Sequence, residues 1–207
     1  MFDIALIIGY YGSIVAIMNP FTALNNYVTL TESMKREEAE HVIKQALLVV
    51  IFLGLLFILA GKLILEFYHL SLASLKFGGG LLLLYIAVDM LSGQPKSKTV
   101  EGGEVAVVPL ATPMIVGPGT MTLLINLGTT GNLPEVIISF FLATFTVAVT
   151  MKGAFHLRKL LGRNGIKAMA RFMSLIIASV AAQMLWSAVK EWSIELGLTK
   201  TAESSFY

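Results

Sequence analysis

The sequence predicts an all-α integral membrane protein with six transmembrane helices, arranged as two inverted-topology three-helix repeats whose first and fourth spans are discontinuous. Three observations lead to this fold class. The 207 residues are 56% hydrophobic and only 14% charged, whereas a soluble domain is typically about 25% charged. Apolar runs long enough to cross a bilayer recur along the whole chain. Two of these runs carry helix-breaking residues at matching positions.

Six apolar windows of about 20 residues, the length that crosses a hydrocarbon core, divide the chain. They cover 4–30, 46–65, 72–91, 105–127, 136–151 and 172–189. Between the last two windows, 152–171 is expected to form a basic loop. The domain organisation that follows is a first repeat at 1–91, a cytoplasmic linker rich in Gly, Ser and charge at 92–104, a second repeat at 105–190 and an extracytoplasmic tail at 191–207.

The distribution of Lys and Arg predicts the orientation. With six spans the connecting segments alternate sides, and eleven of the 15 Lys and Arg residues fall on one side. The positive-inside rule places the richer side in the cytoplasm, so both termini are expected to be extracytoplasmic. The first residues lack the basic region of a removable signal peptide, so the first run is expected to stay in the mature protein. We therefore expect a multi-pass protein of the inner or plasma membrane.

The two interrupted spans resemble each other. Asn19-Pro20-Phe21-Thr22 in the first span corresponds to Gly117-Pro118-Gly119-Thr120 in the fourth, with a shift of 98 residues. Proline removes a backbone donor and clashes with the preceding turn, so each tetrapeptide should break its helix. Two further matches follow in the same order: Lys76-Phe77 with Arg171-Phe172, and Asp89-Met90-Leu91 with Gln183-Met184-Leu185. Because each repeat has an odd number of spans, the second copy must enter the membrane from the opposite side.

Paired interrupted helices in inverted halves indicate a transporter with its binding site near the midplane. A half-helix that begins inside the membrane presents unpaired N–H groups and a positive dipole end, which suit a carboxylate. The carbonyls that end the preceding half-helix suit an ammonium group. The candidate substrate-binding residues are Asn19, Pro20, Thr22, Asn25 and Asn26 at the first break, and Gly117, Pro118, Gly119, Thr120, Thr122 and Asn126 at the second.

Helical spacing places Asn19, Thr22 and Asn26 on one face, and Thr122 and Asn126 on another. The two polar faces are expected to point at each other around a small zwitterion. The alternative is that these side chains only hydrogen-bond neighbouring helices and that the prolines only serve packing. For any single Thr the packing role is favoured, whereas the pairing of the two breaks favours ligand binding.

Charged residues inside the spans are few. Asp89, near the end of the third span, is a candidate for binding a coupling proton or cation, with an interfacial position as the alternative. Lys76 and Arg171 are expected to be anchors that extend to the membrane interface. Gly78, Gly79 and Gly80 are expected to serve close helix packing.

Nothing in the sequence indicates an enzyme. The chain has no cysteine, and its three histidines lack metal-ligand spacing. No nucleophile elbow, P-loop or dinucleotide motif occurs, so no cofactor, metal or nucleic-acid partner is expected. Transport would be passive or driven by an ion gradient, with a proton or sodium as the coupling ion. The oligomeric state stays open.

The stretch from Pro109 to Thr120, PLATPMIVGPGT, resembles the second signature of the MarC family of six-span inner-membrane proteins. Asn19-Pro20, running on to Leu30-Thr31, resembles the first signature in part; Thr22, Ala23 and Asn25 depart from the usual Gly, Asn and Pro. The resemblance implies two inverted three-helix repeats with discontinuous first and fourth helices. It also implies transport of small neutral amino acids such as glycine and alanine.

Together these observations predict a secondary transporter of glycine-, alanine- or serine-sized amino acids that works by alternating access in the lipid bilayer. The main alternative is a membrane scaffold or assembly protein whose broken helices serve packing. An intramembrane redox or lipid enzyme is a third hypothesis, which the lack of cysteine and of a catalytic cluster disfavours.

Overall fold

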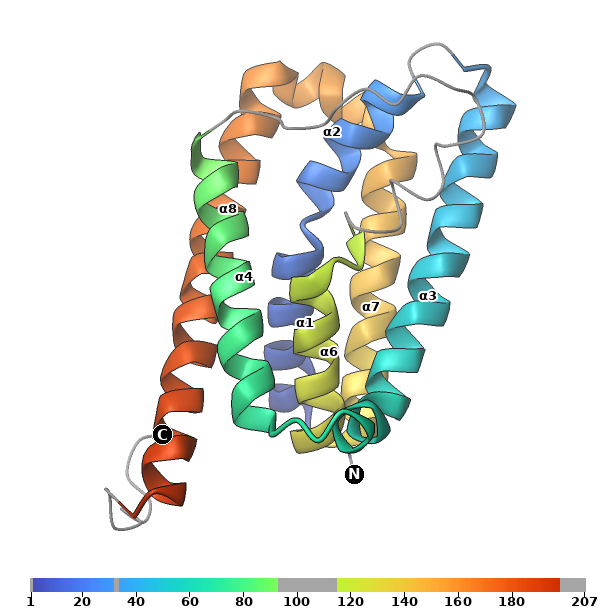
Figure 1. Ribbon diagram of the computed structural model, residues 1–207. Helices are drawn as coiled ribbons and strands as arrows, with labels where there is room; N and C mark the ends of the chain where they lie inside the picture. The colour runs from blue at the N-terminus through green and yellow to red at the C-terminus, as the bar shows by residue number, and fades with distance from the viewer. Residues whose placement is uncertain (1, 32–33, 93–114, 198–207) are drawn as a thin grey trace.

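The structure, a computed structural model, describes residues 2–31, 34–92 and 115–197. These residues are helical almost throughout, and Figure 1 labels their helices. The helices are α1 (Ile4–Met18), α2 (Pro20–Leu30), α3 (Arg36–Phe67), α4 (Leu72–Ser92), α6 (Pro118–Thr130), α7 (Leu133–Lys152) and α8 (Ala154–Glu195). The all-α fold class is confirmed.

Five segments of the described chain are long and apolar enough to cross a membrane. They are Ile4–Leu24, Glu37–Phe67, Leu72–Leu91, Leu133–Lys152 and Asn164–Glu195. Each contains one of the expected spans or most of it. The remaining expected span, 105–127, is described only from residue 115, and α6 is its second half. The expected linker lies outside the described residues apart from its first residue.

The helices alternate in direction along the chain (Figure 1). In that view α1 and α2, α4 and α7 rise, whereas α3, α6 and the long part of α8 descend. The start of α1 and the end of α8 therefore lie at the same end of the bundle, and the start of α3 lies at the other. An inverted repeat requires this order of directions, but the repeat itself stays a prediction because residues 93–114 are outside the described chain.

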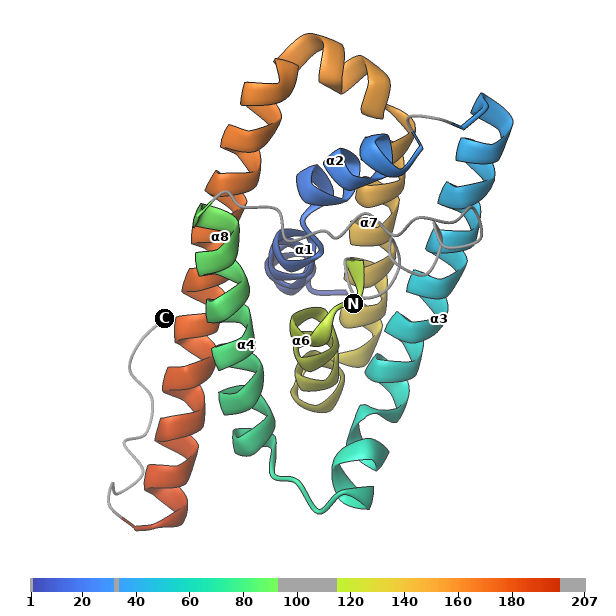
Figure 2. The same cartoon turned by 45° about the horizontal axis from the view of Figure 1, so that its top comes forward.

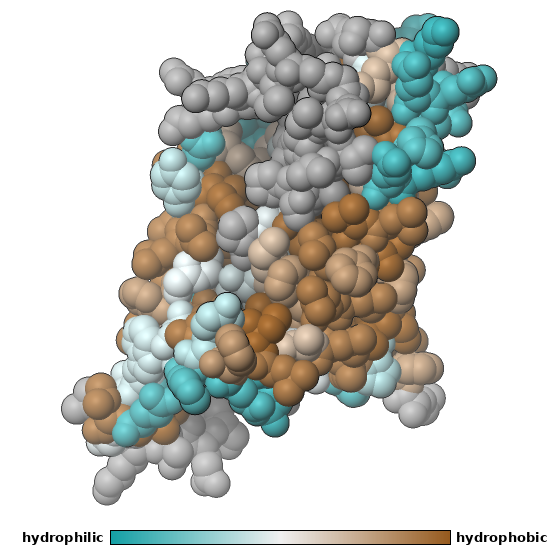
Figure 3. Space-filling model, turned by 45° about the vertical axis from the view of Figure 1, so that its right-hand side comes forward, coloured by the Kyte–Doolittle hydropathy of each residue, from teal (hydrophilic) through white to brown (hydrophobic). Residues whose placement is uncertain are grey.

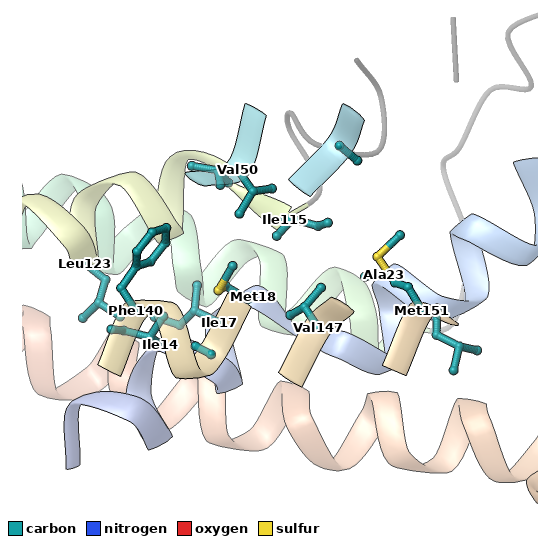
Figure 4. Packing of buried hydrophobic residues seen from close by; sticks show 14 of the residues in the cluster. Ile14, Ile17, Met18, Ala23, Val50, Ile115, Leu123, Phe140, Val147 and Met151 are labelled. Carbon is teal, nitrogen blue, oxygen red and sulfur yellow. The ribbon is translucent and has the colours of Figure 1, made fainter. Parts of the chain in front are cut away.

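Two helix pairs flank a central group. The pairing of α4 with α8 is the most extensive, α1 packs on α7, and α3 packs on α6. Figure 2 shows α1 and α6 in the centre, between the α4–α8 pair and the α3–α7 pair. Buried side chains from these helices form one hydrophobic cluster that includes Leu83 and Ile177. Figure 4 shows part of it, with Ile14, Val50 and Phe140.

The outer surface is strongly apolar. Phe52, Leu63 and Phe145 are each about two-thirds exposed, at 68%, 66% and 67%. A broad apolar surface separates hydrophilic groups at opposite ends of the molecule in Figure 3. Large exposed apolar surfaces on a soluble protein mark an interaction site, and here the lipid chains of a bilayer are their natural contact.

The prediction of a basic loop at 152–171 is wrong. The segment is helical from Ala154 onward and is interrupted only at Gly162, whose φ of 64° lies in the left-handed region. Lys and Arg are good helix formers, so a charged segment needs no loop conformation. Helix α8 also continues to Glu195, into the segment 191–207 that was expected to be an extracytoplasmic tail.

Candidate functional site

Asn19 makes the first break. It has φ 44° and ψ 76°, ends α1 and begins α2. Its backbone N–H donates to the Val15 carbonyl at 3.0 Å, while its side-chain Oδ1 accepts from the Thr22 N–H at 3.1 Å. Asn tolerates the left-handed region better than most residues, and Pro20 is suited to a first helical position. One residue therefore terminates a helix and caps the next one.

Asn19 also connects the break to α4. Its side chain is buried, and its Nδ2 donates to the Met90 Sδ at 3.8 Å. Asp89, the candidate coupling residue, is the neighbour of Met90 in the last turn of α4 and is half-buried. The structure thus places Asp89 one residue from a direct contact of the first break. A role in binding a proton or cation stays a prediction.

The second break is capped differently. Helix α6 begins at Pro118, and its N-cap residue Gly117 has no side chain that could cap it. The Met121 N–H donates to the Gly117 carbonyl at 2.9 Å. The Thr120 hydroxyl donates to the Ile115 carbonyl at 2.9 Å, so it satisfies an acceptor of the preceding segment. The N–H groups of Gly119 and Thr120 have no acceptor within their own helix.

The two breaks lie against each other. A Cβ atom placed on Gly119 would lie 3.8 Å from Cγ2 of Ile17, the second-last residue of α1, and 2.2 Å from Cδ2 of Leu83 in α4. Ile17, Met18 and Ile115 belong to the same buried cluster (Figure 4). The carbonyl end of α1 and the N–H end of α6 are therefore neighbours, and both are buried.

These helix ends carry opposite partial charges. The carbonyl end of a helix carries about half a negative elementary charge, and the N–H end about half a positive one. In α1 the Val15 carbonyl accepts the Asn19 N–H, which leaves the carbonyls of Ala16, Ile17 and Met18 without an N–H from their own helix. The last turn of α1 and the first turn of α6, which carry these acceptors and donors, thus approach each other inside the bundle at Ile17 and Gly119.

The candidate residues of the second break are mostly buried. Gly117, Gly119, Thr120 and Thr122 are buried, whereas Asn126 is half-buried and its Oδ1 atom is buried without a hydrogen-bond partner. At the first break Asn19 is buried and Thr22 half-buried. Asn25 and Asn26 lie on α2, and Pro118 starts α6, but their side chains are outside the described part of the structure.

The polar faces of the two half-helices do not form a continuous facing pair. From the breaks α2 runs toward one end of the bundle and α6 toward the other (Figure 1). The main partners of α2 are α7 and α8, whereas those of α6 are α3 and α4. Thr122, for example, lies against Gly79 of α4, where an added Cβ would meet its Cγ2 at 2.0 Å. Among the described residues, the approach between the two breaks is that of Ile17 to Gly119.

Lys76 is not the interfacial anchor that the sequence predicts. It is 7% exposed and forms an ion pair with Glu191, and its Nζ donates to the Ser187 Oγ at 3.4 Å. The pair joins α4 to α8, and the Phe77 and Trp192 rings pack beside it at 5.2 Å between centroids. Because the partners are far apart in the sequence, no local pattern indicates the pair.

Glu135 is a second residue that sequence reasoning missed. It lies in the first turn of α7 and is 3% exposed. Its Oε1 accepts from the Asp3 backbone N–H at 3.3 Å, and its Oε2 is buried without a hydrogen-bond partner. The available signal was a carboxylate directly before the fifth apolar window, where the sequence analysis singled out no residue.

Comparison with known proteins identifies the family. The family model described as "MarC family integral membrane protein" matches residues 4–193. A UPF0056 membrane protein of Methanocaldococcus jannaschii is 33% identical over 200 residues, which cover 91% of this chain and 98% of that protein. The UPF0056 inner membrane protein YhgN of Escherichia coli is 28% identical over 185 residues, covering 86% and 93%. No solved structure matches the chain. The chain belongs to the MarC family of integral membrane proteins.

Proposed function

We propose that this protein is a secondary transporter of small neutral amino acids of the size of glycine, alanine or serine. It would work by alternating access around the two helix breaks and be driven by an ion gradient. It would lie in the cell membrane with both termini outside. The observation that carries the proposal is the contact between the carbonyl end of α1, at Ile17, and the N–H end of α6, at Gly119.

The charges at this contact match a zwitterion. The N–H groups of Gly119 and Thr120 suit a carboxylate, because helix N-termini bind anions without a basic side chain. The carbonyls of Ile17 and Met18 suit an ammonium group. The N-terminus of α2 is less available, because the Asn19 side chain already accepts from its first turn. The proposal therefore assigns the carboxylate to α6 and the ammonium group to the end of α1.

The packing around the breaks favours a small substrate. Leu83 lies so close to Gly119, and Thr122 so close to Gly79, that neither glycine has room for one additional carbon atom. A substrate with a large side chain would need space that these helices occupy. Glycine, alanine and serine add few atoms beyond the zwitterion itself.

Alternating access needs an element that can change direction. The break at Asn19 joins two helices through a single residue, and the break at Gly117 is preceded by proline-rich sequence. Discontinuous helices at the interface of two repeats are a recurrent feature of transporters that work in this way. Membership of the MarC family supports the proposal through the resemblance described above.

Uptake into liposomes tests the function. Purified protein in liposomes should accumulate labelled glycine and alanine when a proton or sodium gradient is imposed, and should exclude labelled phenylalanine. Small amino acids should also raise its thermal stability, because a ligand that binds only the folded state stabilises it. If neither uptake nor stabilisation occurs, the alternative of a scaffold or assembly protein is favoured.

A further inference from the structure

Residues 152–171, which we name the basic segment, are positively charged and contain no acidic residue. The segment carries six Lys and Arg residues, and no Asp or Glu occurs between Glu135 and Glu191. Four of the six basic side chains are described, and all four are exposed: Lys152, Lys159, Lys167 and Arg171. None of the four forms a salt bridge with another described side chain. Their charges therefore face outward without a partner from the described chain.

The opposite face of the basic segment is fixed on the bundle. Ala154 and Ile166 belong to the buried hydrophobic cluster, and Leu157 packs against it. Leu160, by contrast, is 84% exposed and follows the exposed Lys159 directly. The segment thus presents an apolar side chain together with basic ones outward, a combination that is typical of helices lying in a membrane interface.

The candidate membrane spans place the basic segment at the level of the lipid headgroups. The span of α7 ends at Lys152, and that of α8 begins at Asn164. Between them α8 turns across the end of the bundle and bends at Gly162 (Figures 1 and 2). The α8 span has 32 residues, whereas about 20 cross a hydrocarbon core. Its first turns, with Lys167 and Arg171, therefore have room in the headgroup region.

Other acidic partners fit this surface less well. The acidic first turn of α3, with Glu37 and Glu38, lies at the same end of the bundle. However, the extensive contacts of α3 are with α6 and α7, not with α8. A soluble polyanion would pair with the basic side chains but leave Leu160 in water. An anionic lipid offers a charged headgroup and an apolar chain at once.

We propose that the basic segment is a binding site for anionic phospholipids of the bilayer in which the protein lies. Lys159, Lys167 and Arg171 contact the lipid phosphates, while Leu160 enters the outer part of the acyl chains. The long stems of the Lys and Arg side chains let their charged ends reach the headgroups. The inference does not depend on the proposed transport function.

A lipid titration tests the site on the full chain in neutral detergent. Because the chain has no cysteine, Asn164→Cys can carry an environment-sensitive fluorophore inside the segment. Its emission should change and saturate with short-chain phosphatidylglycerol, at a far lower concentration than with phosphatidylcholine of the same chain length. The triple variant Lys159→Gln, Lys167→Gln, Arg171→Gln should need roughly 100-fold more phosphatidylglycerol, since each cation near an anionic surface contributes about fivefold.

Matched variants separate this site from the overall charge of the protein. Lys62→Gln with Lys190→Gln removes two exposed cations outside the segment and should leave the midpoint unchanged. Exchange of Lys for Arg and Arg for Lys at the three tested positions should preserve binding. Raised ionic strength should weaken it.

Three results would overturn the proposal. The first is an equal midpoint for phosphatidylglycerol and phosphatidylcholine, and the second is an equal midpoint for the wild type and the triple variant. The third is saturation by glycerol phosphate at the same concentration as phosphatidylglycerol, which would indicate a site for a free anion instead of a lipid. Thermal unfolding in neutral detergent checks that the triple variant is folded, as its exposed positions lead us to expect.

Discussion

Ile17 and Gly119 bring two helix ends of opposite polarity together inside the bundle. A Cβ atom placed on Gly119 would be in ordinary van der Waals contact with the Ile17 Cγ2, at 3.8 Å. The contact joins a helix that ends at Met18 to a helix that begins at Pro118. At the two breaks, backbone N–H and C=O groups lack partners within their own helices and are shielded from water. Such groups are tolerated at membrane depth only when they face protein or a polar cavity.

The first prediction concerns Gly119. Gly119→Ala should reduce glycine uptake at least tenfold and lower the stability by about 1–3 kcal/mol, because the new methyl group would overlap Leu83. Gly78→Ala is the matched control, since nothing lies within 4 Å of a Cβ at that position. Normal uptake by Gly119→Ala, with Gly78→Ala also normal, would show that close packing at the second break is not required.

The second prediction concerns the left-handed residue at the first break. Asn19→Ala should cost about 2–3 kcal/mol, because it loses the cap to Thr22 and places a Cβ-bearing residue without a local hydrogen bond at φ 44°. Asn19→Gly should cost only a few tenths of a kcal/mol, since glycine adopts this conformation freely. Thermal unfolding in detergent measures both variants. Equal losses would contradict the role assigned to the backbone.

The third prediction concerns the ion pair between Lys76 and Glu191. Lys76→Met alone should destabilise the protein by about 1–3 kcal/mol, between the limits for exposed and buried pairs, because Lys76 is buried and Glu191 about one-third exposed. The double variant Lys76→Met, Glu191→Leu should recover most of this loss, since no charge is left unpaired. A double-mutant cycle measures the coupling. Additive losses would mean that the pair contributes nothing to the α4–α8 contact.

The fourth prediction concerns orientation. Because the chain has no cysteine, single cysteines can report on each end of α3 without a background. Glu66→Cys, at the end of α3, should react with a membrane-impermeant thiol reagent on intact cells, and Glu37→Cys, at its start, only after the membrane is opened. The reverse pattern would place both termini in the cytoplasm.

Local sequence predicted the helical parts and the first break well. Long apolar runs form helices in lipid whatever their partners, and Asn19-Pro20 breaks a helix by its own chemistry, as the structure places it. The prediction of a basic loop near Gly162 was wrong because charge was taken for irregular structure, although Lys and Arg favour helices.

The site was less predictable because it depends on direction and on distant contacts. Thr22 and Thr122 were expected on facing surfaces, but α2 and α6 leave the breaks in opposite directions. Lys76 meets Glu191, and Glu135 meets Asp3, across more than a hundred residues in each case. A single sequence carries no signal for such pairs, so Lys76 was interpreted as an anchor and Glu135 was not singled out.

The fifth prediction concerns the recognition of both charges of the substrate. Thermal stabilisation and competition against glycine exchange should be measured with glycine, glycinamide and acetate. If the ends of α1 and α6 bind a zwitterion, glycine should stabilise the protein and compete, whereas glycinamide, which lacks the carboxylate, and acetate, which lacks the ammonium group, should do neither at the same concentration. Equal effects of glycine and either analogue would contradict the account.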